Sequence, residues 1–217
     1  MKDISTKILK IIQESEKILL HCHPYPDPDS VGSVLAFSLY LKSLKKNVTA
    51  VPGDFDLPKS LRKLPNLNVF TKKNFNEINI EDFDLFIILD SASVYQITQL
   101  KEISFPKTLK TINIDHHITN GGFADINLLK PEKSSTCEII FELFKSWNVK
   151  IDQDIAIALF VGIFGDTGGF KYQNTTFRTL EIASKLAKIN PNFHEIVFDM
   201  ENSKEKEVIR YMGLALN

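Results

Sequence analysis

The chain has 217 residues, of which 43% are hydrophobic, and a formal net charge of −1 at pH 7. This composition suits one large domain with a real core and gives no global attraction to nucleic acid or anionic membranes. The longest apolar runs are strand-length, which excludes a membrane span, and the mixed polar and apolar residues 1–17 predict no signal peptide. Cys22 and Cys137 lie far apart, so we expect two buried small hydrophobes in a reducing, cytoplasmic setting.

Apolar runs and apolar periodicities divide the chain into elements. The helical spacing within Ile4–Ile12 predicts a first helix, and the apolar run in Lys17–Cys22 predicts a first strand. The next predicted elements are a helix over Val31–Leu44, a strand over Asn47–Val51, a short helix over Pro58–Leu64, a short strand over Leu67–Phe70, and strands over Asp84–Leu89 and Thr108–Ile114. The remaining predicted elements are helices over Ser135–Trp147, Asp152–Phe164, Thr176–Ile189, Phe193–Asp199 and Ser203–Leu216.

This order of elements predicts an α/β fold. We expect a doubly wound, mainly parallel five-stranded sheet with helices on both faces and a helical C-terminal part. Residues 1–190 form the predicted domain, and residues 191–217 form a helical tail. Ligands of such sheets bind beyond the carboxyl ends of the strands. One rim should therefore carry a set of acids and histidines: His23, Asp27, Asp29, Asp90, Asp115, His116 and His117.

The stretch from His21 to Asp29 holds two histidines, two aspartates and three prolines within nine residues. Proline fixes φ and favours an extended conformation at the residue before it, so we expect Asp27 and Asp29 on a stiff, extended loop. Asp29 or Ser30 is then expected to cap the following helix. Taken alone, the stretch is explained equally well as a proline-rich turn with an Asp N-cap.

The strand and helix ends carry six candidate metal ligands: His23, Asp27, Asp29, Asp90, His116 and Asp166. Mixed Asp and His ligands without cysteine favour Mn²⁺ or Mg²⁺ over structural zinc. Converging carboxylates repel one another, and two divalent ions about 3.5–4 Å apart remove that repulsion and form a site for attack on phosphorus. Asp90 stands alone after a buried strand and is the expected bridge. Each residue also has a structural explanation as a cap, turn former or surface residue, but six at one rim favour a metal site.

Four motifs occur in order along the chain: His23–Asp29, Asp90, Asp115–His117 and Gly162–Phe170. Together they resemble the DHH phosphoesterase family from about Ile18 to Leu186. The resemblance implies a two-metal phosphoesterase with a parallel αβα domain that uses Mn²⁺, with Mg²⁺ or Co²⁺ as alternatives. The closest pattern is the branch of oligoribonucleases and pAp phosphatases, which includes cyclic-dinucleotide phosphodiesterases.

The resemblance also implies a role for each candidate residue. One metal would be held by His23, Asp27 and Asp90. The second would share Asp90 and be held by Asp29, His116 and Asp166.

Three further residues receive implied roles from their positions. His117 would face the scissile phosphate, and Asp115 would orient a histidine from behind the metal ligands. The nucleophile would be a metal-bridging hydroxide. Lys171 follows the last motif and is explained equally well as a substrate phosphate contact or as a solvated surface charge. His21 matches no ligand position.

Two features depart from the family pattern. Pro28 stands between the paired aspartates, where the family usually has glycine, and this bears on the loop geometry more than on the ligands. Members of the branch continue into a second domain with a glycine-rich, histidine-containing motif. No such stretch occurs in this sequence, and residues 191–217 resemble the start of an inter-domain helix.

Three functions therefore stay open. The first is hydrolysis of phosphodiester or phosphomonoester bonds in short oligonucleotides, pAp or cyclic dinucleotides. The second is a pyrophosphatase or exopolyphosphatase, and the third is a metal-binding module made inactive by loss of the substrate domain. The expected partners are a nucleotide or short oligonucleotide substrate and no membrane, with a homodimer left open.

Overall fold

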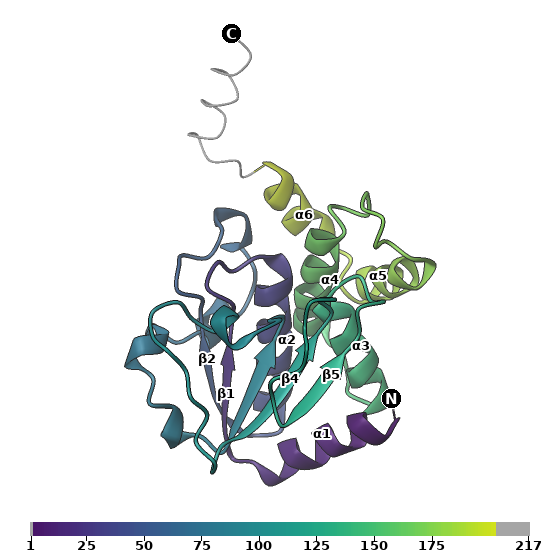
Figure 1. The fold of residues 1–217 in the computed structure, drawn as a ribbon. Helices are drawn as coiled ribbons and strands as arrows, with labels where there is room; N and C mark the ends of the chain where they lie inside the picture. Colours follow the sequence, from purple (N-terminus) through teal and green to yellow (C-terminus); the bar gives the residue numbers. More distant parts are fainter. Residues whose placement is uncertain (1, 203–217) are drawn as a thin grey trace.

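Five short strands pair in one direction to form the sheet at the centre of the structure (Figure 1). The computed structural model describes residues 2–202, and the predicted helix over Ser203–Leu216 lies outside them. The strands are β1 (Lys17–His21), β2 (Asn47–Val51), β3 (Leu85–Leu89), β4 (Lys110–Asp115) and β5 (Ile126–Leu129). Their order is β2-β1-β3-β4-β5, and every pair is parallel, which confirms the predicted α/β fold.

The predicted helices form with small shifts at their ends. They are α1 (Lys2–Glu14), α2 (Pro28–Ser43), α3 (Thr136–Ser146), α4 (Gln153–Asp166), α5 (Phe177–Ile189) and α6 (Phe193–Asn202). Within residues 2–202, no helix combines the length and the apolar character that crossing a bilayer requires. The predicted short helix over Pro58–Leu64 is a single 3-10 turn, η1 (Lys59–Leu61).

The fifth strand differs from the prediction. The predicted strand over Leu67–Phe70 is wrong, because Leu67–Val69 forms a 3-10 turn (η2) and Phe70 makes only an isolated bridge to Ala50. The fifth strand is β5, which lies at one edge of the sheet and pairs with β4 from Ile112 onward. The run Ile-Asn-Leu-Leu is short and carries a polar residue, so its periodicity alone did not predict a strand.

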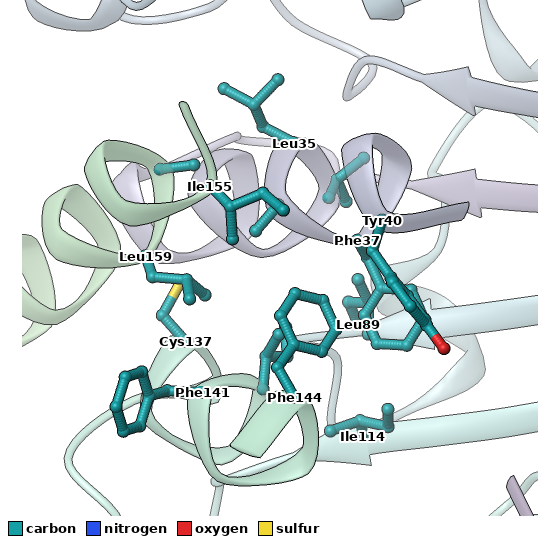
Figure 2. Packing of buried hydrophobic residues seen from close by; sticks show 14 of the residues in the cluster. Leu35, Phe37, Tyr40, Leu89, Ile114, Cys137, Phe141, Phe144, Ile155 and Leu159 are labelled. Atoms are coloured by element: carbon teal, nitrogen blue, oxygen red, sulfur yellow. The ribbon is translucent and has the colours of Figure 1, made fainter. Parts of the chain in front are cut away.

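The two faces of the sheet bury separate apolar clusters, because successive side chains of a strand point to opposite faces. One cluster joins the strands to α2, α3 and α4, where the rings of Phe37 and Phe144 lie 5.6 Å apart beside Leu89 and Ile114 (Figure 2). The other face, with Phe86 at its centre, is covered by loops and by the 3-10 turns η3 (Phe75–Glu77), η4 (Ile80–Asp82) and η5 (Val94–Gln96). Helical segments thus cover both faces, and those on the second face are single turns.

Helices α2 and α4 pack closely because glycines lie at their contact. A Cβ on Gly32 of α2 would collide with the carbonyl oxygen of Ala158 in α4. A Cβ on Gly165 would collide with the ring of Pro28. This packing brings the first turn of α2 against the last turn of α4, where two of the candidate ligands lie.

Candidate metal centre

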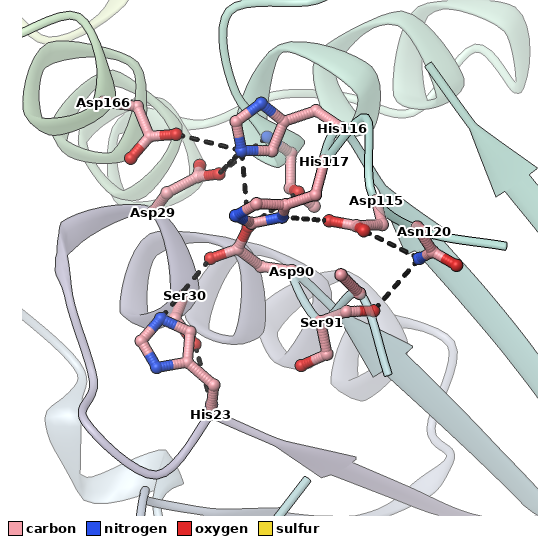
Figure 3. Close-up of polar contacts among 12 residues, drawn as sticks. His23, Asp29, Ser30, Asp90, Ser91, Asp115, His116, His117, Asn120 and Asp166 are labelled. Carbon is pink, nitrogen blue, oxygen red and sulfur yellow. Dashed lines mark hydrogen bonds and ion pairs between the residues drawn. The ribbon is translucent and has the colours of Figure 1, made fainter. Parts of the chain in front are cut away.

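The carboxyl ends of β1, β3 and β4 meet the ends of α2 and α4 at one rim of the sheet (Figure 3). The strand order reverses between β1 and β3, so the loops that follow these strands diverge and leave room for a ligand. His23 follows β1, Asp90 follows β3, and His116 follows β4. The structure brings all six candidate ligands together at this rim: His23, Asp27, Asp29, Asp90, His116 and Asp166.

Asp90 lies at the centre of the cluster and is only 2% exposed. Its Oδ2 lies 3.7 Å from His23 Nε2, and its Oδ1 lies 3.6 Å from His116 Nε2. The two oxygens of one carboxylate therefore face two different histidines. The backbone of Asp90 has a φ of 54°, in the left-handed region that non-glycine residues rarely adopt and that often marks a functional position.

The ligand atoms fall into three overlapping groups, of which two contain Asp90, and one of these two consists of Asp90, His116 and His117. His23, Asp27 and Asp90 form one group whose ligand atoms lie within 4.8 Å of one another. Asp29, His116 and Asp166 form another group of the same size, and His116 also groups with Asp90. This division is the one implied by the resemblance to the DHH family.

The donor set fits a divalent cation. His116 Nε2 is buried and makes no hydrogen bond, although it lies 3.1 Å from Asp166 Oδ2 and 4.0 Å from Asp29 Oδ2. A buried imidazole nitrogen without a hydrogen-bond partner is rare, and one that faces several carboxylates is suited to coordinate a metal ion. Carboxylate oxygens and imidazole together suit Mn²⁺ or Mg²⁺.

The protonation of the cluster also reflects crowded negative charge. Burial and the neighbouring Asp29 carboxylate raise the pKa of Asp90 well above its ordinary value. Burial and Asp166 raise the pKa of Asp29 to about 7. Burial lowers the pKa of His116, but Asp166 and Asp29 outweigh it and raise that pKa to about 9. These shifts favour protons on the cluster, and a divalent ion that binds there would compete with them.

The loop between β1 and α2 differs from the prediction. Asp29 does not lie on an extended loop, because α2 begins at Pro28, three residues before the predicted start. Asp27, rather than Asp29 or Ser30, is the N-cap, and its Oδ1 accepts a hydrogen bond of 2.9 Å from the Ser30 N–H. Proline is favoured in the first turn of a helix, and here its ring packs against Gly165. Pro28 therefore starts the helix and leaves Asp27 Oδ2 free to lie 3.3 Å from His23 Nε2.

Asp29 connects the centre to α3. It is fully buried, and its two carboxylate oxygens accept hydrogen bonds from the backbone N–H groups of Thr136 (2.6 Å) and Cys137 (2.9 Å). The Thr136 hydroxyl donates to Asp90 Oδ1 at 3.1 Å. Ser135 is the N-cap of α3, and no local sequence pattern predicts the contact of the Thr136 hydroxyl with the centre.

His117 lies beside the cluster and is held from behind. Its Nδ1 lies 2.7 Å from Asp115 Oδ1, and Asp115 Oδ2 accepts a hydrogen bond of 2.7 Å from Asn120. Burial raises the pKa of Asp115, but the hydrogen bonds from His117 and Asn120 outweigh it and lower that pKa below its ordinary value. Asp115 in turn raises the pKa of His117, whose side chain is 40% exposed, against 14% for His116. Asn120 was not singled out from the sequence, because nothing in the spacing marks an asparagine five residues after Asp115.

Two other polar residues lie apart from the cluster. His21 points to the opposite face of the sheet and packs edge-on against Phe86, with ring centroids 5.4 Å apart. The side chain of Lys171 is 71% exposed, and its Nζ lies 3.9 Å from the Glu201 carboxylate of α6. A substrate contact by Lys171 stays a prediction.

Comparisons with known proteins match the chain to a protein family and to several relatives. Residues 17–163 match the DHH family, N-terminal domain. The chain is 29% identical over 190 residues to the bifunctional oligoribonuclease and PAP phosphatase NrnA of Bacillus subtilis, with 84% of this chain and 56% of that protein covered. It is 27% identical over 175 residues to the probable manganese-dependent inorganic pyrophosphatase of Enterococcus faecalis, with 80% of this chain and 55% of that protein covered.

A solved structure has a similar fold. The exopolyphosphatase-related protein from Bacteroides fragilis is 26% identical and superposes with a TM-score of 0.88, over 100% of this chain and 65% of that one. The chain thus spans 55% to 65% of the length of these three relatives. The family match covers most of the chain, including β1 to β5 and most of α4, and the chain therefore belongs to the DHH family and carries its N-terminal domain.

Proposed function

We propose that the chain is a metal-dependent phosphoesterase that hydrolyses phosphodiester or phosphomonoester bonds in short oligonucleotides, pAp or cyclic dinucleotides. The observation that supports this most is the position of Asp90 between two groups of ligand atoms, with one carboxylate oxygen toward each. The similarity to the oligoribonuclease and PAP phosphatase of Bacillus subtilis supports the substrate class.

In this proposal, His23, Asp27 and Asp90 hold one divalent ion, and Asp29, Asp90, His116 and Asp166 hold a second. Mn²⁺ suits this donor set, and a pair of such ions supplies charge neutralisation on the phosphate and activation of water for attack on phosphorus.

The chain's own residues orient the reacting groups. Asp115 accepts a hydrogen bond from Nδ1 of His117, which fixes the ring, and raises the pKa of His117, which favours the doubly protonated ring whose Nε2–H can donate a hydrogen bond to a substrate phosphate oxygen. Asn120 holds Asp115 from its other oxygen. Asp115 and Asn120 are therefore positioning residues, and His117 is the proposed substrate contact.

The test compares the wild-type chain with Asp90→Ala. Calorimetric titration with Mn²⁺ and hydrolysis of pAp and of a dinucleotide should both fail in Asp90→Ala. Asp3→Ala removes a carboxylate that is 89% exposed on α1 and should behave as wild type. Normal Mn²⁺-dependent turnover by Asp90→Ala would contradict the assignment of Asp90.

A second function has its own support. The chain resembles a probable pyrophosphatase and superposes on an exopolyphosphatase-related protein, so pyrophosphate and polyphosphate are the alternative substrates. A panel with pAp, a dinucleotide, pyrophosphate and polyphosphate, each with Mn²⁺, separates the two. Tight Mn²⁺ binding without turnover of any of the four would instead support a metal-binding module that lacks activity.

A further inference from the structure

Two exposed aromatic side chains stack on each other, and one of them follows the candidate ligand His23 by two residues. The rings of Tyr25 and Phe55 lie 4.3 Å apart between centroids and are nearly parallel, at 12°. Tyr25 is 59% exposed and Phe55 is 50% exposed, so part of the stacked pair stays open to solvent. The two residues come from different loops, one after β1 and the other after β2.

The pair is held in place by one hydrogen bond and one close backbone approach between its loops. The Phe55 backbone N–H donates to the carbonyl oxygen of Pro24 at 3.0 Å. Gly53 lies so close to the carbonyl oxygen of His23 that a Cβ there would collide with it. Two tight contacts thus fix the Phe55 loop against the loop that carries His23 and Tyr25.

A third loop, which follows β3, adds further contacts. Asp54 accepts hydrogen bonds of 2.6 Å from the Thr98 hydroxyl and of 2.6 Å from the Gln99 N–H. The Tyr25 hydroxyl lies 3.5 Å from Gln99 Oε1. The stacked pair is therefore preorganised, and a ligand that binds it need not order these loops first.

Tyr25 is joined to two of the candidate metal ligands through the backbone of its loop. Tyr25 lies between His23 and Asp27, two candidate ligands of the same metal ion, in a loop of only three intervening residues. Two residues of extended chain span about 7 Å, so the Tyr25 backbone lies within about that distance of the His23 backbone. This is comparable to the separation between a nucleotide's phosphate and its base, across the sugar.

We propose that Tyr25 and Phe55 form a stacking platform for the nucleobase of a substrate whose phosphate lies at the metal centre. Stacking on aromatic rings accepts any base, because every base has a π face. Pyrophosphate and polyphosphate have no base, so the platform selects nucleotides among phosphate substrates. This inference rests on the proposed phosphoesterase function and names the substrate class that the same site prefers.

The test separates the base from the phosphate. It compares pAp with ribose 3′,5′-bisphosphate, which has the same phosphates and no base, using the full 217-residue chain with Mn²⁺. Tyr25→Ala and Phe55→Ala should lower kcat/KM for pAp by about five- to a hundredfold, mainly through KM, and should leave kcat/KM for the base-free compound unchanged. Tyr25→Phe keeps the ring and should retain most of the wild-type preference for pAp over the base-free compound. Phe177→Ala removes an aromatic ring that is 83% exposed on α5 and should match wild type on both compounds.

A binding measurement keeps the platform testable if no substrate is hydrolysed. Fluorescence of the 2-aminopurine analogue of pAp should be quenched on binding to wild type and to Phe177→Ala, and not by Tyr25→Ala. Suppose that the wild type hydrolyses pAp. If Tyr25→Ala then lowers kcat/KM equally for pAp and for the base-free compound, or changes neither value, the platform is wrong and the phosphoesterase function stands. If nothing is hydrolysed, the proposed function fails, and quenching that survives Tyr25→Ala overturns the platform as well. A dimer that dissociates on Tyr25→Ala, with unchanged quenching, would assign the pair to a second copy of the chain and also overturn it.

Discussion

Thr136 contacts two acids of the metal centre at once. Its backbone N–H donates to Asp29 Oδ2 at 2.6 Å, and its hydroxyl donates to Asp90 Oδ1 at 3.1 Å. The first bond comes from the N-terminus of α3, where a buried carboxylate is favoured. One residue thus fixes a proposed ligand of one metal and the proposed bridge between both.

Replacing the hydroxyl of Thr136 should weaken metal binding without unfolding the chain. Thr136→Val keeps the size of the side chain and the backbone N–H to Asp29, and removes only the hydroxyl bond to Asp90. Loss of a hydrogen bond behind a metal ligand typically lowers metal affinity about 10- to 100-fold, while loss of one buried hydrogen bond costs about 1–3 kcal/mol of stability. Calorimetric titration with Mn²⁺ measures the first effect and urea unfolding the second. Thr136→Ser should restore wild-type affinity, and a valine variant with unchanged Mn²⁺ affinity would show that the contact does not orient Asp90.

Mn²⁺ binding should strengthen as the pH rises from about 6 to 9. The pKa of Asp29 is raised to about 7 and that of His116 to about 9, so both groups hold protons that a metal ion must displace. Calorimetry in two buffers of different ionisation enthalpy should show proton release at pH 7. Affinity that does not change across this pH range would contradict the assignment of these two residues as ligands.

Bound Mn²⁺ should also raise the melting temperature. A ligand at one hundred times its dissociation constant stabilises the folded state by about 2.7 kcal/mol. For a domain of this size, this corresponds to a rise in melting temperature of roughly 5–10 °C. Thermal unfolding with and without Mn²⁺ measures the shift, and EDTA should reverse it. Asp90→Ala should show no shift, and a full shift in that variant would place the ion elsewhere.

His21 should make the metal-free protein less stable in mild acid. Burial lowers the pKa of His21 to about 4, whereas the unfolded side chain titrates near 6.5. The proton therefore binds the unfolded state first, so the stability present above pH 6.5 is lost as the pH falls toward 4. By linkage this loss is about 2 kcal/mol between pH 7 and pH 5.

The matched variant for this prediction is His21→Asn. Its amide can still donate to the carbonyl oxygen of Cys22, which lies 2.8 Å from His21 Nδ1, but it does not titrate. Urea unfolding in EDTA measures the free energy of unfolding at pH 7 and pH 5. Between these pH values the variant should lose about 2 kcal/mol less of this free energy than wild type. The smaller side chain lowers the stability of the variant by the same amount at both pH values. Equal losses would mean that His21 is not held neutral.

The contact between α2 and α4 should not tolerate a methyl group. Gly32→Ala would place Cβ against the Ala158 carbonyl oxygen, and such overpacking typically costs about 1–3 kcal/mol. Gly121→Ala, where a Cβ meets nothing within 4 Å, is the control and should be neutral or slightly stabilising. Denaturant unfolding compares the two, and equal stabilities would mean that α2 and α4 separate at little cost.

The sequence by itself predicted which acids and histidines gather at one rim of the sheet. Apolar patterns marked β1, β3 and β4, and the acids and histidines directly after them were expected to meet, because parallel strands place their carboxyl ends at one edge. The resemblance gave His21 no ligand position, and in the structure the His21 ring packs against Phe86. The conclusion about the rim depends only on local periodicity and on strand direction.

Only the tertiary structure decided which groups support the centre. Asp29 meets the N-terminus of α3 across more than one hundred residues, and Phe55 meets Tyr25 from another loop. The edge strand β5 is a strand because β4 pairs with it, and its own four residues carry little periodicity. Contacts of this kind depend on how α2, α3 and α4 pack together, and no local pattern along the chain records that packing.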